Sequence, residues 1–356
     1  MKIIFITALL IRLICLYLFR NVSNYDLQSY LQVGELTLKG INIYPNVANL
    51  HHPYLPFFLY VEAMAYQIGQ MRLMRPMGQM GSILIIKTIL SIFDLGVTYL
   101  IYLLSKKNLK TTFLYAVNPV TILITTLQGQ FDVIPVFFIL LAIYLLNKKQ
   151  ELPSVLSFSL AVLTKTWPVL FAIPIARKIK NKKLIILIIF FPVLSVLIYC
   201  WLFKSTLIDI SKTLIYYQGL WGVWGPMSLI SLIRPIGPMG QKLTTLTFLT
   251  CFFSYSWFNK EKNLIKNILE LLFFFFVFTT NFSIQYFVWI IPFLILIKPE
   301  KYFHLIMLIT FYLFSFYYAW VFSLITPPWL TIIQNITGFV LWLSFIKIGY
   351  LSRKIS

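Results

Sequence analysis

The chain has 356 residues, of which 60% are hydrophobic and 11% are charged. So little polar surface excludes a fold solvated by water alone and predicts an integral membrane protein. The formal net charge of +20 does not indicate a nucleic-acid partner, because the basic residues lie in short clusters between apolar runs, where they set membrane orientation.

The apolar runs predict membrane-spanning helices, since each approaches the length needed to cross about 30 Å of hydrocarbon. With the basic clusters placed inside, we expect an all-α polytopic protein of about twelve (10–13) transmembrane helices, with both termini cytoplasmic and the plasma membrane as its location. Residues 1–356 are taken as a single transmembrane domain. Two of the runs are short enough to be broken or re-entrant, 152–165 and 167–176. The expected spans are 3–19, 82–104, 111–127, 131–147, 152–165, 167–176, 184–203, 241–258, 267–281, 285–297, 302–325 and 330–348.

Two segments do not fit as spans and are expected to be long outer loops, 20–81 and 204–240. In the first, apolar and polar residues separate roughly along a helical stretch that ends near Lys39-Gly40, as in a helix lying at the membrane interface. Residues 54–68 are expected to form a second interfacial helix. The other loop carries aromatic residues suited to the headgroup level or to stacking on a sugar, including Trp221 and Trp224.

Asp26 follows the first span directly and is therefore held at the outer membrane surface. A carboxylate there is suited to act as the general base that takes a proton from an acceptor hydroxyl during sugar transfer with inversion. Its neighbours Tyr25 and Glu35 are candidate substrate contacts in the same loop.

Asp94 and Lys87 lie in the second span, on one helical face. Charges inside a membrane are costly and mark functional sites by default, so both are candidate substrate-binding residues. The alternative is that this face forms a structural polar seam or an ion pair that holds helices together, and the sequence leaves both open.

Gln130, Asp132 and Lys165 are expected at outer junctions between spans. Asp132 either contacts a ligand or caps the fourth span, because Asp is a favoured N-cap residue. Lys165 either binds a lipid phosphate or extends to the headgroups.

The remaining candidates are outer-loop and interfacial residues whose alternatives are plainer. His52 could contact the donor phosphate, although a surface loop is the simpler interpretation of His51-His52. The outer cations could hold a phosphate or bind lipid headgroups, and the polar aromatic segment near residue 286 could bind sugar or form an interfacial belt. These candidates are Arg72, Arg75, Arg234, Gln285 and Tyr286. Cys15, Cys200 and Cys251 are isolated and offer no zinc-binding spacing.

Four features in order along residues 25–292 resemble the glycosyltransferase-C superfamily, especially polyprenyl-phosphate-mannose-dependent mannosyltransferases related to the catalytic subunit of GPI mannosyltransferase I and their prokaryotic relatives. The features are Tyr25-Asp26 with Gly34-Glu35 and Gly40 to Pro45, then Phe93-Asp94, then Asn118-Pro119 with Gly129 to Asp132, and finally Gln285-Tyr286 with Trp289 and Pro292. The first loop departs from the pattern at His51-His52-Pro53, where relatives more often show Tyr-Pro-Pro.

The resemblance implies that Asp26 is the catalytic acid or base. It also implies a dolichyl- or polyprenyl-phosphate sugar donor, with mannose favoured over glucose, and a glycan, glycolipid or protein acceptor. No cofactor is expected, and the residues leave metal dependence open. Two other classes remain, a transporter or flippase of lipid-linked sugars and a scaffold subunit without catalysis. The sequence shows no paired halves of the kind common in transporters, and a scaffold would leave Asp26 unexplained.

Overall fold

A computed structural model describes all residues except 73, 218, 234–235, 323–326 and 355–356. Within the described residues the chain is helical and forms no β-strand, apart from one isolated bridge between Trp221 and Asn281. It divides into two compact units, each described here by itself: residues 1–172 with 176–217, and residues 173–175 with 218–356.

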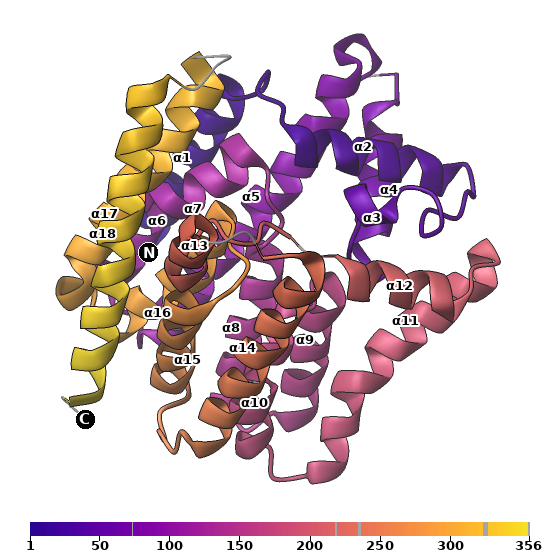
Figure 1. Ribbon diagram of the computed structural model, residues 1–356. Coiled ribbons are helices and arrows are strands. Elements are labelled where there is room, and N and C mark those ends of the chain that lie inside the picture. Colours follow the sequence, from indigo (N-terminus) through magenta and orange to yellow (C-terminus); the bar gives the residue numbers. More distant parts are fainter. Residues whose placement is uncertain (73, 218, 234–235, 323–326, 355–356) are drawn as a thin grey trace. The chain divides into compact units, whose positions relative to one another are not determined.

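Unit 1 contains the first outer loop and the helices that support it (Figure 1). Helices form at both places where interfacial helices are expected, as α2 and α4, and they pack against each other. The α-helices of this unit are α1 (Lys2–Leu18), α2 (Tyr25–Leu38), α3 (Ala48–His51), α4 (Phe58–Gly69), α5 (Gln79–Leu104), α6 (Leu109–Ala116), α7 (Pro119–Leu123), α8 (Val133–Asn147), α9 (Glu151–Thr164), α11 (Leu187–Phe203) and α12 (Leu207–Tyr216).

Unit 2 is built mainly from long apolar helices (Figure 1). In it α15 packs against α16 and α18, and α17 packs along α18. Its α-helices are α13 (Gly225–Ile233), α14 (Pro238–Phe258), α15 (Leu264–Phe278), α16 (Phe287–Ile297), α17 (Pro299–Phe322) and α18 (Pro328–Lys354), and α10 (Ala172–Lys178) lies where the chain passes between the units.

Shorter turns interrupt some of the expected spans. The run 167–176 is broken, as expected, because the 3₁₀ turn Trp167–Phe171 precedes α10. The run 111–127 is also broken, because Pro119 begins a new helix and a π-helical turn follows at Ile124–Gln128. The other 3₁₀ turns are Arg75–Met77, Lys182–Ile186 and Ile284–Tyr286.

Three of the described helical segments are long and apolar enough to cross a membrane, Gln79–Leu104, Lys182–Phe203 and Pro328–Leu351. Shorter apolar helices at Val133–Asn147, Glu151–Thr164 and Ile284–Ile297 accompany them. These segments fit a membrane protein.

The segment 204–240, which is expected to be the other outer loop, contains two short helices, α12 and α13. Thr206 starts α12 because its side-chain oxygen accepts a hydrogen bond from the backbone N–H of Asp209 (3.2 Å) and donates to the Asp209 carboxylate (2.7 Å). This local capping signal is independent of hydrophobic pattern.

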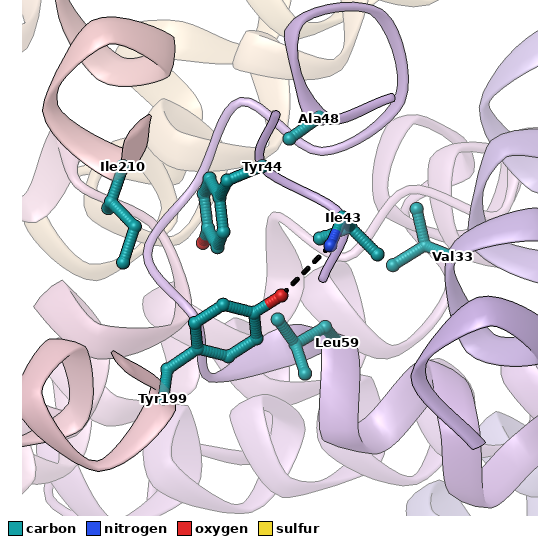
Figure 2. Close-up of a cluster of buried hydrophobic side chains, with 7 residues drawn as sticks. All are labelled: Val33, Ile43, Tyr44, Ala48, Leu59, Tyr199 and Ile210. Atoms are coloured by element: carbon teal, nitrogen blue, oxygen red, sulfur yellow. Dashed lines mark hydrogen bonds between the residues drawn. The ribbon is translucent and has the colours of Figure 1, made fainter. Parts of the chain in front are cut away.

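A buried cluster connects the first outer loop to α11 and α12 (Figure 2). Tyr199 of α11 accepts a hydrogen bond from the backbone N–H of Ile43 (3.0 Å) and donates one to the side chain of Asn42 (3.1 Å). The rings of Tyr44 and Tyr199 meet edge to face at 5.0 Å. The loop that carries Asp26 is therefore packed against the helices of unit 1 rather than extended into solvent.

Candidate functional site

The start of α2 places Asp26. The Asn24 side chain accepts a hydrogen bond from the backbone N–H of Leu27 (3.0 Å) and caps the helix, while its amide donates to the backbone carbonyl of Gln128 (2.7 Å). Asp26 lies in the first turn of α2, where a negative charge is favourable. Asn24 thus caps the start of α2 and joins this helix to the segment that follows α7.

Gln130 holds the Asp26 carboxylate by donating a hydrogen bond from its side-chain amide. The Tyr30 hydroxyl donates a hydrogen bond to the side-chain carbonyl oxygen of Gln130, at 3.3 Å. Because the amide oxygen accepts from Tyr30, its nitrogen is the atom that faces Asp26. The two contacts fix both the orientation of the amide and the position of the carboxylate.

The environment of Asp26 raises the pKa of its carboxyl group above the usual value. Burial is the main cause, and the charge of Asp132 acts in the same direction. The positive charge of Lys165 and the hydrogen bond from Gln130 oppose the rise. A partly buried carboxylate with a raised pKa is a stronger proton acceptor than an exposed one.

The segment that carries Gln130 contains a backbone conformation that few residue types adopt. It leaves the π-helical turn through Gly129, whose φ is 73°. A Cβ at this position would lie 2.7 Å from Cδ2 of Leu27 in α2. Glycine is therefore required both for the left-handed conformation and for the close approach to α2. Short π-helical turns are frequent at functional sites.

Lys165 and Asp132 form a buried ion pair, with 2.8 Å between Nζ and the carboxylate oxygen. The ammonium group also lies over two rings, 5.1 Å from the centroid of Tyr54 and 4.6 Å from that of Phe131. Asp132 occupies the N-cap position of α8, but its side chain makes no cap hydrogen bond. Of the two alternatives for Asp132, capping is therefore wrong, because the carboxylate turns to Lys165.

These contacts gather four of the predicted residues at one place in unit 1, Asp26, Gln130, Asp132 and Lys165. The cluster combines a carboxylate suited to accept a proton with a buried ammonium suited to meet an anion. Tyr217 belongs to the same surroundings, since burial raises the pKa of its hydroxyl and the charge of Lys165 lowers it. Two carboxylates, an amide and an ammonium group thus lie together in one partly buried cluster.

The family model of glycosyltransferase family 87 matches residues 65–260, more than half of the chain. The chain belongs to glycosyltransferase family 87. The matched part of this family 87 chain includes Gln130, Asp132 and Lys165, whereas Asp26 precedes it. No curated protein and no solved structure matches the chain.

Two histidines of the first outer loop have separate environments in this family 87 protein. His51 stacks on Tyr25, with ring centroids 5.4 Å apart, and its Nδ1 shares a 2.7 Å hydrogen bond with Ser29. His52 is fully buried, and its Nδ1 lies 3.3 Å from the carboxylate of Glu62. Burial raises the pKa of Glu62. The expectation of a plain surface loop was therefore wrong for His52.

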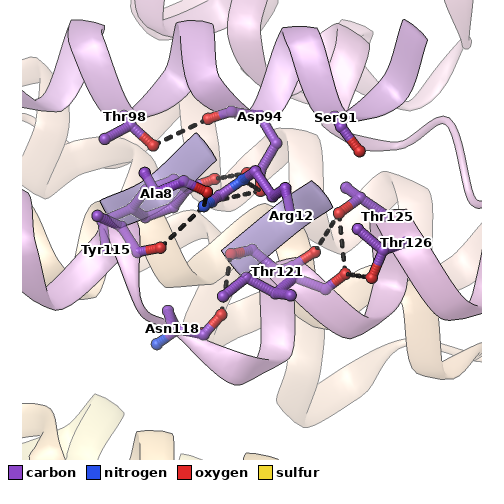
Figure 3. Close-up of polar contacts among 12 residues, drawn as sticks. Ala8, Arg12, Ser91, Asp94, Thr98, Tyr115, Asn118, Thr121, Thr125 and Thr126 are labelled. Carbon is purple, nitrogen blue, oxygen red and sulfur yellow. Dashed lines mark hydrogen bonds and ion pairs between the residues drawn. The ribbon is translucent and has the colours of Figure 1, made fainter. Parts of the chain in front are cut away.

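Asp94 is fully buried and engaged by two side chains from other helices (Figure 3). Arg12 of α1 donates to its Oδ2 from two nitrogens, at 2.9 and 2.7 Å. Tyr115 of α6 donates to Oδ1 at 2.7 Å. A further nitrogen of Arg12 donates to the backbone carbonyls of Ala8 and Ala116 (both 2.9 Å). Of the two alternatives for Asp94, this is the ion pair that joins helices.

Lys87 shares the buried face of α5 with Asp94, as expected. Its ammonium donates to the backbone carbonyls of Phe19 and Val22, each at 2.9 Å. These carbonyls follow the end of α1, where acceptors lack helical partners. Lys87 thus provides hydrogen bonds to backbone carbonyls between α1 and α2 and positions the segment that leads to Asp26.

The other predicted residues lie outside this cluster. Glu35 forms an ion pair with Lys39 on the surface of α2, and Arg72 and Arg75 are exposed. Gln285 and Tyr286 belong to unit 2, where Gln285 accepts a hydrogen bond from Ser283 and Tyr286 stacks on Trp289 at 4.2 Å. Arg234 lies outside the described residues.

Residues that sequence reasoning missed include the aromatic partners of the charged groups, Tyr30, Tyr54 and Phe131, and the cation Arg12. Arg12 could have been found, because it is an intramembrane charge in the first expected span and the rule that singled out Asp94 applies to it equally. The aromatic residues had no comparable signal in a chain in which 18% of the residues are Phe, Trp or Tyr.

Proposed function

We propose that this family 87 protein transfers a hexose from a polyprenyl-phosphate carrier to a glycan, glycolipid or protein acceptor, with inversion at the anomeric carbon. Family membership supports sugar transfer. The observation that carries the finer proposal is the hydrogen bond from Gln130 to Asp26, next to the buried ion pair of Lys165 and Asp132.

In this proposal Asp26 is the general base. The acceptor hydroxyl attacks the anomeric carbon, its proton passes to the Asp26 carboxylate, and the bond from that carbon to the phosphate oxygen breaks. The carrier leaves as a polyprenyl phosphate anion. Gln130 orients the base, and Lys165 stabilises the negative charge that develops on the phosphate.

A lipid-linked donor suits a protein whose helices are this apolar, because the carrier chain and the site then share the membrane. The donor already carries an activated leaving group, so we propose a transfer that needs no cofactor. Mannose as the hexose rests on the resemblance of the motifs from Tyr25 to Pro292 to mannosyltransferases.

We further propose about twelve spans with both termini cytoplasmic and the site at the outer face of the plasma membrane. Each expected span coincides with a helix or a broken helix of the structure. In this topology the start of α2 and the residues after α7 and after α9 all lie at the outer side. The structure brings Asp26, Gln130 and Lys165 from these three places together within unit 1, which supports the assignment.

The test is sugar transfer by the purified protein in lipid nanodiscs, with synthetic polyprenyl-phosphate mannose or glucose as donor and membrane extract as acceptor pool. We expect Asp26→Asn to lower the rate by about 10²–10⁴, the usual contribution of a positioned base. Asp209→Asn is the matched control, because Asp209 also lies in the first turn of an outer-loop helix, α12. Running the assay with EDTA and with Mg²⁺ measures metal dependence.

Equal rates for the wild type and Asp26→Asn would remove Asp26 as the base. A well-folded wild type that transfers sugar from neither donor but moves the lipid-linked sugar across a vesicle membrane would contradict the enzyme proposal and indicate a transporter.

A further inference from the structure

Unit 2 contains a cavity of about 400 Å³ that belongs to none of the predicted sites. It lies among α13, α17, α18 and the turn at Gly222–Gly225, all of them in unit 2. Its volume falls in the range of sites that bind small molecules.

Two tryptophans of fixed orientation form part of the wall. The indole N–H of Trp224 donates to the backbone carbonyl of Phe276 (2.7 Å), and that of Trp342 donates to Val277 (3.0 Å). Trp224 also stacks on Phe282, with centroids 4.2 Å apart. Trp224 is only 3% exposed and supports the wall from behind, whereas Trp342 is partly exposed. Because its N–H group is satisfied by the protein, Trp342 offers ring surface to a ligand rather than a hydrogen bond.

Glycines allow the aromatic side chains to approach so closely. Gly225 has a φ of 58°, and a Cβ there would lie 3.1 Å from Nε1 of Trp342. A Cβ on Gly338 would lie 3.1 Å from Cε2 of Tyr312. Larger residues at these two positions would push the rings away, so the shape of the cavity depends on them.

The polar groups of the wall are neutral. Tyr312 is 6% exposed, and its hydroxyl has no hydrogen-bond partner among the described residues. Gln334 donates one hydrogen bond, to the backbone carbonyl of Ser315 (3.1 Å), and Asn335 is exposed. None of the described residues that line the cavity carries a charge.

The depth of the Asn335 amide favours a polar occupant over an apolar one. Asn335 lies about 10 Å along the candidate span that begins at Pro328. Amides and hydroxyls at such depth are costly unless they form hydrogen bonds. A lipid tail would offer no hydrogen bond to the Asn335 amide or the Tyr312 hydroxyl, and a phosphate would find no cation in the described wall. Stacked rings beside neutral amides and hydroxyls match a sugar, which has apolar C–H faces and a rim of hydroxyl groups.

We propose that this cavity binds one neutral sugar unit of a substrate, separately from the residues around Asp26. The choice of ligand rests on the proposed function, since a glycosyltransferase handles sugars on both its donor and its acceptor. The structure assigns Trp342 to stacking, with the buried Trp224 as support, and Tyr312, Gln334 and Asn335 to hydrogen bonding.

The test is saturation-transfer NMR on the full chain in nanodiscs, with methyl glycosides of mannose and glucose and their disaccharides as probes and glycerol as a non-sugar polyol. We expect saturation of the sugar C–H protons and none of glycerol. Asn335→Leu should weaken binding about tenfold, because a sugar hydroxyl loses its partner. Ser344→Ala, a partly exposed position on the same helix outside the cavity, is the matched control.

Binding by Asp26→Asn at the wild-type level supports the separate site, and this result does not depend on whether Asp26 is the base. A selective rise in the KM of the acceptor in Asn335→Leu would identify an acceptor sugar, and a selective rise in the KM of the donor would identify the donor sugar. No saturation of any glycoside, or equal binding by the wild type and Asn335→Leu with both variants folded as judged by thermal unfolding, would overturn the proposal.

Discussion

At the scale of single residues, the function of Asp26 depends on what surrounds it. Burial raises the pKa of its carboxyl group, while Lys165 and Gln130 lower it. A general base acts in its deprotonated form, so the rate falls as the pH drops through this pKa. In the proposed mechanism, the opposing influences therefore set the acidic limit of activity.

We predict that kcat/KM declines on the acidic side by about tenfold per pH unit, starting above the ordinary range of an aspartate. Lys165→Met removes the charge that lowers the pKa of Asp26. The acidic limb of the pH–rate profile, where kcat/KM declines, should therefore move to higher pH, whatever happens to the maximal rate. Initial rates across a pH series measure both effects. Asp209→Asn should keep the wild-type limb, and an unmoved limb in Lys165→Met would contradict the role of this lysine.

At the scale of elements, the buried network of Arg12, Asp94 and Tyr115 joins α1, α5 and α6 (Figure 3). Four hydrogen bonds from one guanidinium satisfy a charge that would otherwise be isolated. The Lys87 contacts to Phe19 and Val22 extend this connection to the start of the first outer loop. We infer that these charges position α1, and through it α2 and Asp26.

We predict that Asp94→Asn destabilises the protein by about 3–5 kcal/mol, because it leaves the buried Arg12 charge uncompensated. Thermal unfolding in nanodiscs measures the loss. Replacing both partners, Arg12→Met with Asp94→Leu, should recover much of it. Ser91→Ala, on the same buried face of α5, is the control. A midpoint for Asp94→Asn equal to that of Ser91→Ala would show that the network contributes little.

The sequence predicted elements better than contacts. Hydrophobic runs located the long helices, and amphipathic pattern located α2 and α4. It missed α12 because a cap, and not a pattern, starts that helix at Thr206. It named Asp26, Gln130, Asp132 and Lys165 separately, but could not pair Lys165 with Asp132, since pairing depends on how a π-helical turn and Gly129 direct the chain.

At the scale of the whole molecule, the two compact units differ in what they contain. Unit 1 holds the charged cluster with the proposed base. Unit 2 holds the uncharged aromatic cavity near Trp224 and Trp342. Under the two proposals, proton transfer and phosphate recognition belong to one unit and recognition of a neutral sugar to the other.

We predict that cysteine labelling in intact cells will show the first outer loop outside and the basic loops inside. After replacement of Cys15, Cys200 and Cys251 by Ser, a membrane-impermeant maleimide should modify Asn46→Cys in intact cells and Lys180→Cys only after permeabilisation. Both positions are exposed. The positive-inside distribution of Lys and Arg is the physical reason. Reversed labelling would place the Asp26 cluster on the cytoplasmic side.

The ion pair between Arg12 and Asp94 also has a consequence for biosynthesis. The two residues are 82 positions apart, so α1 leaves the ribosome well before its partner helix exists. In the proposed topology, a guanidinium in the middle of the first span costs about 2.5–3.5 kcal/mol on insertion scales during that interval. The apolar residues of α1 therefore have to offset this cost without a counter-charge until α5 is synthesised.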